Sequence, residues 1–292
     1  MKMKGYKGFN PDWTCRDKQY AIGETYEEET AKMCRSGIHF CEYPLDVLGY
    51  YPPVGTNMEL NKFAVVEADD LSPEKADDTK RVCKKLKLQA ELNFAGLAKA
   101  AVEYIREQAG SDNTKSASGH RSVASNAGDQ SVASNTGDYS LASNTGNQSV
   151  ASNTGYQSVA SNAGDHSVAS NAGDRSVASN TGYQSVASNT GHRSVASNTG
   201  YQSVASNAGN QSVSSNTGDW SVAKVEGAES IALSIGYKSA AAASLGSWIV
   251  LAEWGNKGGE YHIIDVKSAR VDGEHIKPDT LYRLEKGEFV EA

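Results

Sequence analysis

A nine-residue repeat fills the middle of the chain and restricts the folds that are open to it. Its unit reads Ser-Val-Ala-Ser-Asn-Thr/Ala-Gly-x-x, and glycine returns at every ninth position from Gly110 to Gly236. One unit carries too little apolar surface to fold alone, so a fixed period over this length predicts stacked units. Ser, Asn, Thr and Gly favour turns and extended backbone over helix interiors. The repeat therefore predicts a parallel β-solenoid.

Within each unit we expect a five-residue strand, Ser-Val-Ala-Ser-Asn, followed by a four-residue corner, Thr/Ala-Gly-x-x. The corner glycine is expected to supply a backbone conformation that other residues resist. Either two or three units complete one coil. With two units per coil and a spacing of about 4.8 Å, the rod would hold roughly seven coils and measure about 34 Å.

Side chains alternate across a strand, which leaves two ways to pack the rod. One face carries an aliphatic row from Val123 to Ile231, and the other carries small residues such as Ser149, Ala151 and Asn153. If the aliphatic row points inward, the exterior is polar. If the small residues point inward, the rod is thin and its outward aliphatic row needs a partner chain, because soluble monomers rarely expose a long apolar stripe. The sequence leaves both packings open.

The segments on either side of the repeat have ordinary globular composition. We predict a mainly β protein with a small α+β domain over residues 1–108, the solenoid over 109–246 and a C-terminal antiparallel β cap over 247–292. A helix is expected from Asn93 to about Arg106, because Asn is a good N-cap and an apolar stripe at helical spacing follows it. The cap would stop edge-to-edge growth of the solenoid. Asp272-Gly273 is expected to be a hairpin turn within it.

Four cysteines lie in the first 83 residues, which is typical of intracellular thiols or a metal site rather than of a disulfide scaffold. Three thiols and an imidazole suffice for a tetrahedral structural zinc. The candidate ligands are Cys15, Cys34, His39 and Cys41. The alternative is that these four are ordinary core residues, and no other cofactor is expected.

Charge and hydropathy exclude several classes of protein. The net charge is −7 and no segment is strongly basic, so we expect no nucleic-acid binding. No apolar run is long enough to span a membrane, and the first eleven residues lack the apolar core of a signal peptide. These features predict a cytoplasmic protein of a bacterial host cell, with no membrane contact.

The two residues after each repeat glycine vary, whereas the rest of the unit is nearly constant. Tyr, Trp and Arg are common in binding surfaces, so stacked corners would form columns that recognise a protein. The alternative is that the corners are simply solvated. The candidate binding residues are Tyr139, Tyr156, Arg175, Tyr183, Arg193, Tyr201 and Trp220.

Two parts of the chain resemble known families. The Ser-Val-Ala triplet and the corner Gly resemble the head repeats of trimeric autotransporter adhesins. The first 106 residues resemble an uncharacterised N-terminal domain that is common in phage and prophage proteins. That resemblance rests on Lys7-Gly-Phe9, Thr14-Cys-Arg16, Gly23-x-Thr-Tyr26, Cys34-x-Ser-Gly-x-His39, Pro44-Leu-Asp-Val47 and Ala101-Val-Glu-Tyr-Ile105. It implies a phage or prophage origin and no known activity.

The sequence contains no P-loop, dinucleotide fingerprint, catalytic triad or metalloprotease motif. We therefore expect a non-enzymatic phage or prophage protein that acts by protein binding or assembly through its solenoid, as a homo-oligomer. Inhibition of a host defence system is one role that fits this description. The alternatives are an ADP-ribosyltransferase-like enzyme in the N-terminal domain and a structural or ice- or surface-binding repeat protein.

Overall fold

The computed structural model describes residues 2–55, 59–74, 76, 78–108 and 114–292. The chain divides into two compact units, Met1–Tyr104 and Ile105–Ala292. The first repeat glycine, Gly110, and the predicted start of the solenoid at residue 109 lie outside the described residues.

The N-terminal unit is built on an antiparallel sheet with the strand order β4-β7-β5-β1-β6. Because β7 also pairs with β6, four of these strands close into a ring around an apolar core that contains Phe9, Phe40 and Leu86. A short hairpin of β2 and β3 follows β1. The strands are β1 (Met3–Phe9), β2 (Thr14–Cys15), β3 (Lys18–Gln19), β4 (Thr25–Glu27), β5 (Ile38–Cys41), β6 (Lys62–Leu71) and β7 (Lys80–Leu92).

Two helices complete this unit. The 3₁₀ helix η1 (Pro44–Gly49) begins at its proline. The helix α1 (Phe94–Gln108) begins after Asn93, as the sequence predicts. The backbone N–H of Gly96 donates to Asn93 Oδ1 at 2.8 Å, which is an N-cap contact. The ring of Tyr104 packs against that of Tyr43 at 5.4 Å, so α1 contributes to the core of the N-terminal unit.

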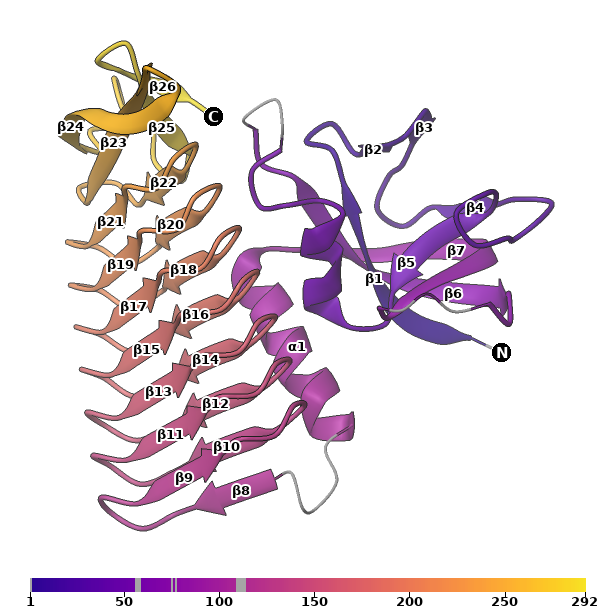
Figure 1. Ribbon diagram of the computed structural model, residues 1–292, viewed down its shortest axis with the longest axis horizontal. Coiled ribbons are helices and arrows are strands. Elements are labelled where there is room, and N and C mark those ends of the chain that lie inside the picture. Colours follow the sequence, from indigo (N-terminus) through magenta and orange to yellow (C-terminus); the bar gives the residue numbers. More distant parts are fainter. Residues whose placement is uncertain (1, 56–58, 75, 77, 109–113) are drawn as a thin grey trace. The chain divides into compact units, whose positions relative to one another are not determined.

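The repeat forms a parallel β-solenoid, as predicted, and it has about eight coils where roughly seven were expected (Figure 1). Each coil uses two repeat units, so that even-numbered strands stack in one sheet and odd-numbered strands in another, and Val159 pairs with Val177 eighteen residues later. The even strands are β8 (Thr114–Ala117), β10 (Val132–Asn135), β12 (Val150–Asn153), β14 (Val168–Asn171), β16 (Val186–Asn189), β18 (Val204–Asn207), β20 (Val222–Val225) and β22 (Ala240–Ala243). The odd strands are β9 (Val123–Asn126), β11 (Leu141–Asn144), β13 (Val159–Asn162), β15 (Val177–Asn180), β17 (Val195–Asn198), β19 (Val213–Asn216), β21 (Ile231–Ser234) and β23 (Trp248–Lys257).

Small residues fill the interior of the solenoid. The repeat alanines form a continuous buried cluster from Ala124 to Ala205, and the repeat Asn and the Ser before each strand are buried with them. Polar groups bond within this interior: Asn162 Nδ2 donates to the Val168 carbonyl at 2.5 Å, and the Ser167 N–H donates to Ser185 Oγ at 3.1 Å. Of the two packings that the sequence allows, the structure therefore has the one in which the small residues point inward and the rod is thin. The aliphatic row lies on the outer faces of both sheets.

The corner glycines have a different role from the one expected. They do not adopt positive φ; the residue two positions later does, as at Arg175 with φ 55° and Gln184 with φ 50°. The glycines are required because the coils meet there: a Cβ on Gly182 would lie 2.1 Å from the carbonyl oxygen of Gly164. The expectation about backbone conformation is thus wrong, and close approach between stacked corners is the reason for glycine.

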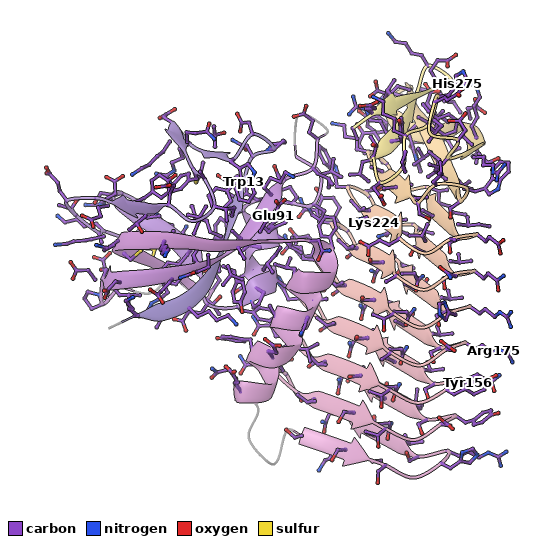
Figure 2. The ribbon with its side chains drawn as sticks, turned by 180° about the vertical axis from the view of Figure 1, so that it is seen from behind. Trp13, Glu91, Tyr156, Arg175, Lys224 and His275 are labelled. Carbon is purple, nitrogen blue, oxygen red and sulfur yellow. The ribbon has the colours of Figure 1, made fainter. Side chains whose placement is uncertain are left out.

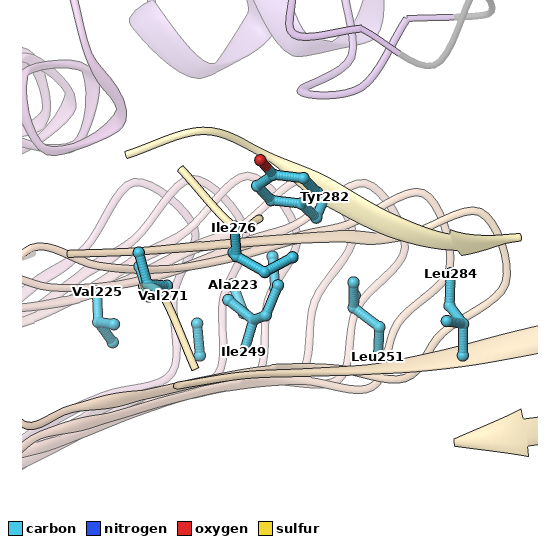
Figure 3. Close-up of a cluster of buried hydrophobic side chains, with 11 residues drawn as sticks. Ala223, Val225, Ile249, Leu251, Val271, Ile276, Tyr282 and Leu284 are labelled. Atoms are coloured by element: carbon cyan, nitrogen blue, oxygen red, sulfur yellow. The ribbon is translucent and has the colours of Figure 1, made fainter. Parts of the chain in front are cut away.

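The interior changes from small to large side chains at the C-terminal end. Ile249 and Leu251 replace the Ala and Asn of the unit, and Ile276, Tyr282 and Leu284 pack on them in one buried cluster (Figure 3). The cap strands are β24 (Glu260–Arg270), which pairs antiparallel with β23, and β25 (Tyr282–Glu285) and β26 (Glu288–Glu291), which extend the even sheet.

Asp272-Gly273 is not a hairpin turn, contrary to the sequence prediction. The strands before and after it, β24 and β25, belong to different sheets. Asp272 Oδ1 instead accepts the N–H groups of Glu274, His275 and Ile276 at 2.8–3.0 Å, and these bonds lower the pKa of its carboxyl. The turn thus directs Ile276 into the buried cluster at the end of the solenoid.

Candidate functional site

The two-unit coil divides the predicted recognition residues between two separate columns of corners. Corners after odd strands, here called the odd column, hold Tyr183, Tyr201 and Trp220. Corners after even strands, the even column, hold Tyr139, Tyr156, Arg175 and Arg193. The structure therefore places the candidate binding residues in two columns.

The even column contains a groove of about 560 Å³ that includes Tyr156, Arg175 and Arg193. The Arg175 guanidinium lies over the Tyr156 ring at 5.5 Å, and both side chains extend outward from their corners (Figure 2). Arg193 Nε donates to Gln211 Oε1 at 2.9 Å. Much of this groove is therefore engaged in contacts along the column.

Stacking also links side chains of the odd column. The rings of Tyr183 and Tyr201 are parallel, with centroids 5.6 Å apart, and the Tyr183 hydroxyl donates to Gln202 Oε1 at 2.9 Å. Lys238 Nζ lies 4.5 Å from the Trp220 ring.

Several corner residues have a structural role that limits the choice of residue. Where Asp or Asn follows the glycine, its side-chain oxygen accepts the backbone N–H of the residue eighteen positions later. Asp138 Oδ1 accepts from Tyr156 at 2.8 Å, and Asp165 Oδ1 accepts from Tyr183 at 2.7 Å. These bonds connect successive coils, so part of the corner composition serves stability rather than recognition.

The outer face of the odd sheet, here called the odd outer face, has no charged side chain in the two rows formed by its eight described parallel strands, and Arg270 of β24 lies beside Trp248 at the end of the first row. Its aliphatic row is largely exposed, with 63% of Val123 and 37% of Val159 accessible, whereas the even-sheet valines are buried. The row consists of the aliphatic residues Val123, Leu141, Val159, Val177, Val195, Val213 and Ile231, and it ends at the aromatic Trp248. Beside it runs a second row of Ser125, Ser143, Ser161, Ser179, Ser197, Ser215, Leu233 and Val250.

A pocket of about 820 Å³ in the N-terminal unit was not anticipated from the sequence. Its lining includes Lys7 from β1, Cys15 from β2, His39 from β5 and Lys80 from β7, together with Tyr51. The one sequence signal for it is Lys7, whose nearest neighbours in β1 are Gly5, Tyr6, Gly8 and Phe9. A lysine buried in such a strand needs a partner, because charged residues are almost never fully buried without one.

The pocket is electropositive. Lys7 is only 5% exposed, and its Nζ donates to Cys15 Sγ at 3.2 Å and to the His39 carbonyl at 3.0 Å. Burial, together with the positive charges of Lys80, Lys7 and Arg16, lowers the pKa of His39 to about 4. His39 Nε2 correspondingly accepts the backbone N–H of Cys34 at 3.0 Å, as a neutral imidazole does.

The lowered pKa of His39 predicts a specific pH dependence of stability. Between pH 6.5 and about 4 the unfolded chain holds a proton at this residue that the folded chain does not, so stability falls as pH falls through this window. In His39→Gln, the amide oxygen can still accept the Cys34 N–H but does not titrate. We expect urea unfolding at pH 7.5, 6 and 5 to show a smaller loss of stability for the variant, and an equal loss would contradict the assignment.

The four predicted zinc ligands have separate partners. Cys15 Sγ faces Lys7, the exposed Cys34 Sγ lies 3.5 Å from Lys80 Nζ, and burial raises the pKa of the Cys41 thiol. Within the described part of the chain, no three His, Cys, Asp or Glu side chains are placed to hold one metal ion. The residues in this arrangement therefore do not fit a zinc site.

A direct measurement tests whether zinc is present in the purified protein. We expect native mass spectrometry to give a mass that the protein chains alone account for, without metal. An additional mass of about 65 Da per chain that is lost in Cys15→Ser would show that the thiols rearrange around zinc.

The fold defines a mainly β protein in which a small α+β domain precedes a parallel β-solenoid. Residues 3–100 match the family model described as Domain of unknown function (DUF7666), which confirms the predicted uncharacterised N-terminal domain. No curated protein and no solved structure matches the chain. None of the described helices is long and apolar enough to span a membrane.

Proposed function

We propose that this is a non-enzymatic solenoid protein that acts by protein binding, and that its odd outer face binds a second copy of the same chain. The observation that supports the proposal is the exposed, uncharged aliphatic row on this face. Burial of apolar surface is the main favourable term in association. The row has six exposed apolar side chains, with Val177 and Val213 half-buried between them, which is more than scattered surface residues explain.

The regular spacing of the row favours a second copy as the partner. Successive side chains of the row are one strand spacing apart, about 4.8 Å. Only a surface with the same spacing can interdigitate with the row over its whole length, and another odd outer face has that spacing. The ridge of aliphatic side chains beside a groove of serines is self-complementary, as an interface around a two-fold axis requires.

The test is the mass of the full chain in solution. We expect sedimentation velocity at 1–50 μM, a range chosen to span typical affinities, to show a dimer for the natural chain. We expect a monomer for the double variant Val159→Lys, Val195→Lys, because each interface would then bury four ammonium groups without partners.

The matched control places lysines at exposed corners, as Gln130→Lys and Gln157→Lys. It adds the same charge to the same solenoid and should leave the dimer intact. Circular dichroism melts of all three proteins check that the coils remain folded. A natural chain that is monomeric throughout, or a Val→Lys variant that stays dimeric, would refute the proposed interface.

The phage or prophage origin and a role against host defence are further parts of this proposal. They are supported by the resemblance of the N-terminal domain and by the absence of known catalytic motifs from the sequence. The two corner columns are left available for a host protein when the odd outer faces pair.

A further inference from the structure

We propose that the pocket of the N-terminal unit binds a small phosphorylated compound with a planar ring, of the nucleotide class. The proposal is independent of self-association through the solenoid. It rests on a buried ammonium group, on the excess of cations around it and on the aromatic character of the walls.

The buried ammonium group is Lys7 Nζ, which lies 5.4 Å from the ring centroid of Phe9 and 5.5 Å from that of Tyr20. A charge taken out of water is costly unless an opposite charge compensates it. The two hydrogen-bond partners of Lys7 are a thiol and a carbonyl, and no described carboxylate lies within ion-pair distance. An anion bound in the pocket would supply the missing charge.

Cations outnumber carboxylates in the pocket lining. Lys7, Arg16, Arg35 and Lys80 line it together with Lys18, which is already paired with Glu28 at 2.7 Å. Asp17 is the one other acidic side chain among the described lining residues. Two guanidinium groups and two ammonium groups suit a phosphate, whose oxygens accept several charge-assisted hydrogen bonds.

Aromatic side chains form much of the remaining wall, and Tyr51 has a fixed place there. A Cβ on Gly8 would lie 2.6 Å from Tyr51 Cβ, so glycine allows Tyr51 to pack directly over β1. Burial, and after it the neighbouring Cys15 thiol, raise the pKa of the Tyr51 hydroxyl. The volume of about 820 Å³ lies in the range of small-molecule sites, and tyrosine faces favour a planar ring.

The experiment is isothermal titration calorimetry of the full chain with AMP, GMP, CMP, UMP, the four nucleosides, pyrophosphate and citrate. We expect at least one nucleotide to bind with Kd below about 1 mM, and its nucleoside to bind at least tenfold more weakly. Arg16→Gln and Arg35→Gln, both at exposed positions, should each weaken the nucleotide at least tenfold. Lys84→Gln removes an exposed cation outside the pocket and should change nothing.

Alkylation by iodoacetamide gives a second readout. The bound nucleotide should slow modification of Cys15 at the pocket wall relative to the same protein without nucleotide. Absence of binding by every nucleotide at 5 mM, well above the expected Kd, would overturn the proposal. Equal binding of nucleoside and nucleotide, citrate binding as tightly as the best nucleotide, or unchanged affinity in both arginine variants would overturn it as well.

Discussion

Gly182→Ala is expected to lower the free energy of unfolding of the solenoid by about 3 kcal/mol. The added methyl group would lie 2.1 Å from the carbonyl oxygen of Gly164 and 2.4 Å from its carbonyl carbon, so two stacked corners would have to separate. Because backbone rather than a flexible side chain is in the way, the strain cannot be relieved locally. Guanidinium unfolding followed by circular dichroism measures the loss.

Gly119→Ala is the matched control for this prediction. Gly119 occupies the same position in the repeat unit, but it lies in the first coil, and a Cβ there meets nothing within 4 Å. The two variants make the same chemical change at equivalent corner positions, although Ser118 precedes Gly119 where Thr181 precedes Gly182. Equal losses of stability would show that glycine is needed for its intrinsic backbone freedom and not for contact between coils.

Leu251→Ala is expected to destabilise the C-terminal end of the solenoid by about 3 kcal/mol. Leu251 is buried in the cluster with Ile249, Ile276 and Leu284, and truncation would leave a cavity between the last coil and the cap. Thermal unfolding by calorimetry and hydrogen exchange of the Tyr282–Glu285 strand report the effect, since the cap should open first.

Val250→Ala provides the comparison within the same strand. Val250 is half-buried on the outer face, so its truncation removes apolar surface without leaving an enclosed cavity. We expect its effect to be below about 1 kcal/mol. Comparable losses for the two variants would argue against a cap that is anchored by its interior cluster.

The pocket was inaccessible to sequence reasoning because its residues come from separate elements. Lys7, Cys15, His39 and Lys80 span more than seventy positions of the chain and meet only when β7 pairs with both β5 and β6. The zinc hypothesis includes two of these residues, Cys15 and His39, because ligand types are visible in a sequence. Their actual partners depend on which strands lie side by side.

The sequence by itself determined the solenoid, since a nine-residue period of Ser, Asn and Gly has no stable alternative in which single units fold alone. It also determined the start of α1, because the Asn93 cap is a local contact. The sequence did not determine the number of units in a coil, because every unit has nearly the same residues. Each strand pairs with the strand eighteen residues later, and this choice depends on how far each corner turns the chain.

Only the tertiary structure decided which face of the strands lies inside and therefore where the candidate interface is. Short corners hold the two sheets close together, so Ala, Ser and Asn fit between them and the valines point to the outer faces, where those of the odd sheet are largely exposed and those of the even sheet are buried. The same two-unit coil places Tyr156 and Tyr183 in different columns, although both occupy the same position in the repeat. Identical local sequences thus acquire different surroundings, because successive units alternate between the two sheets.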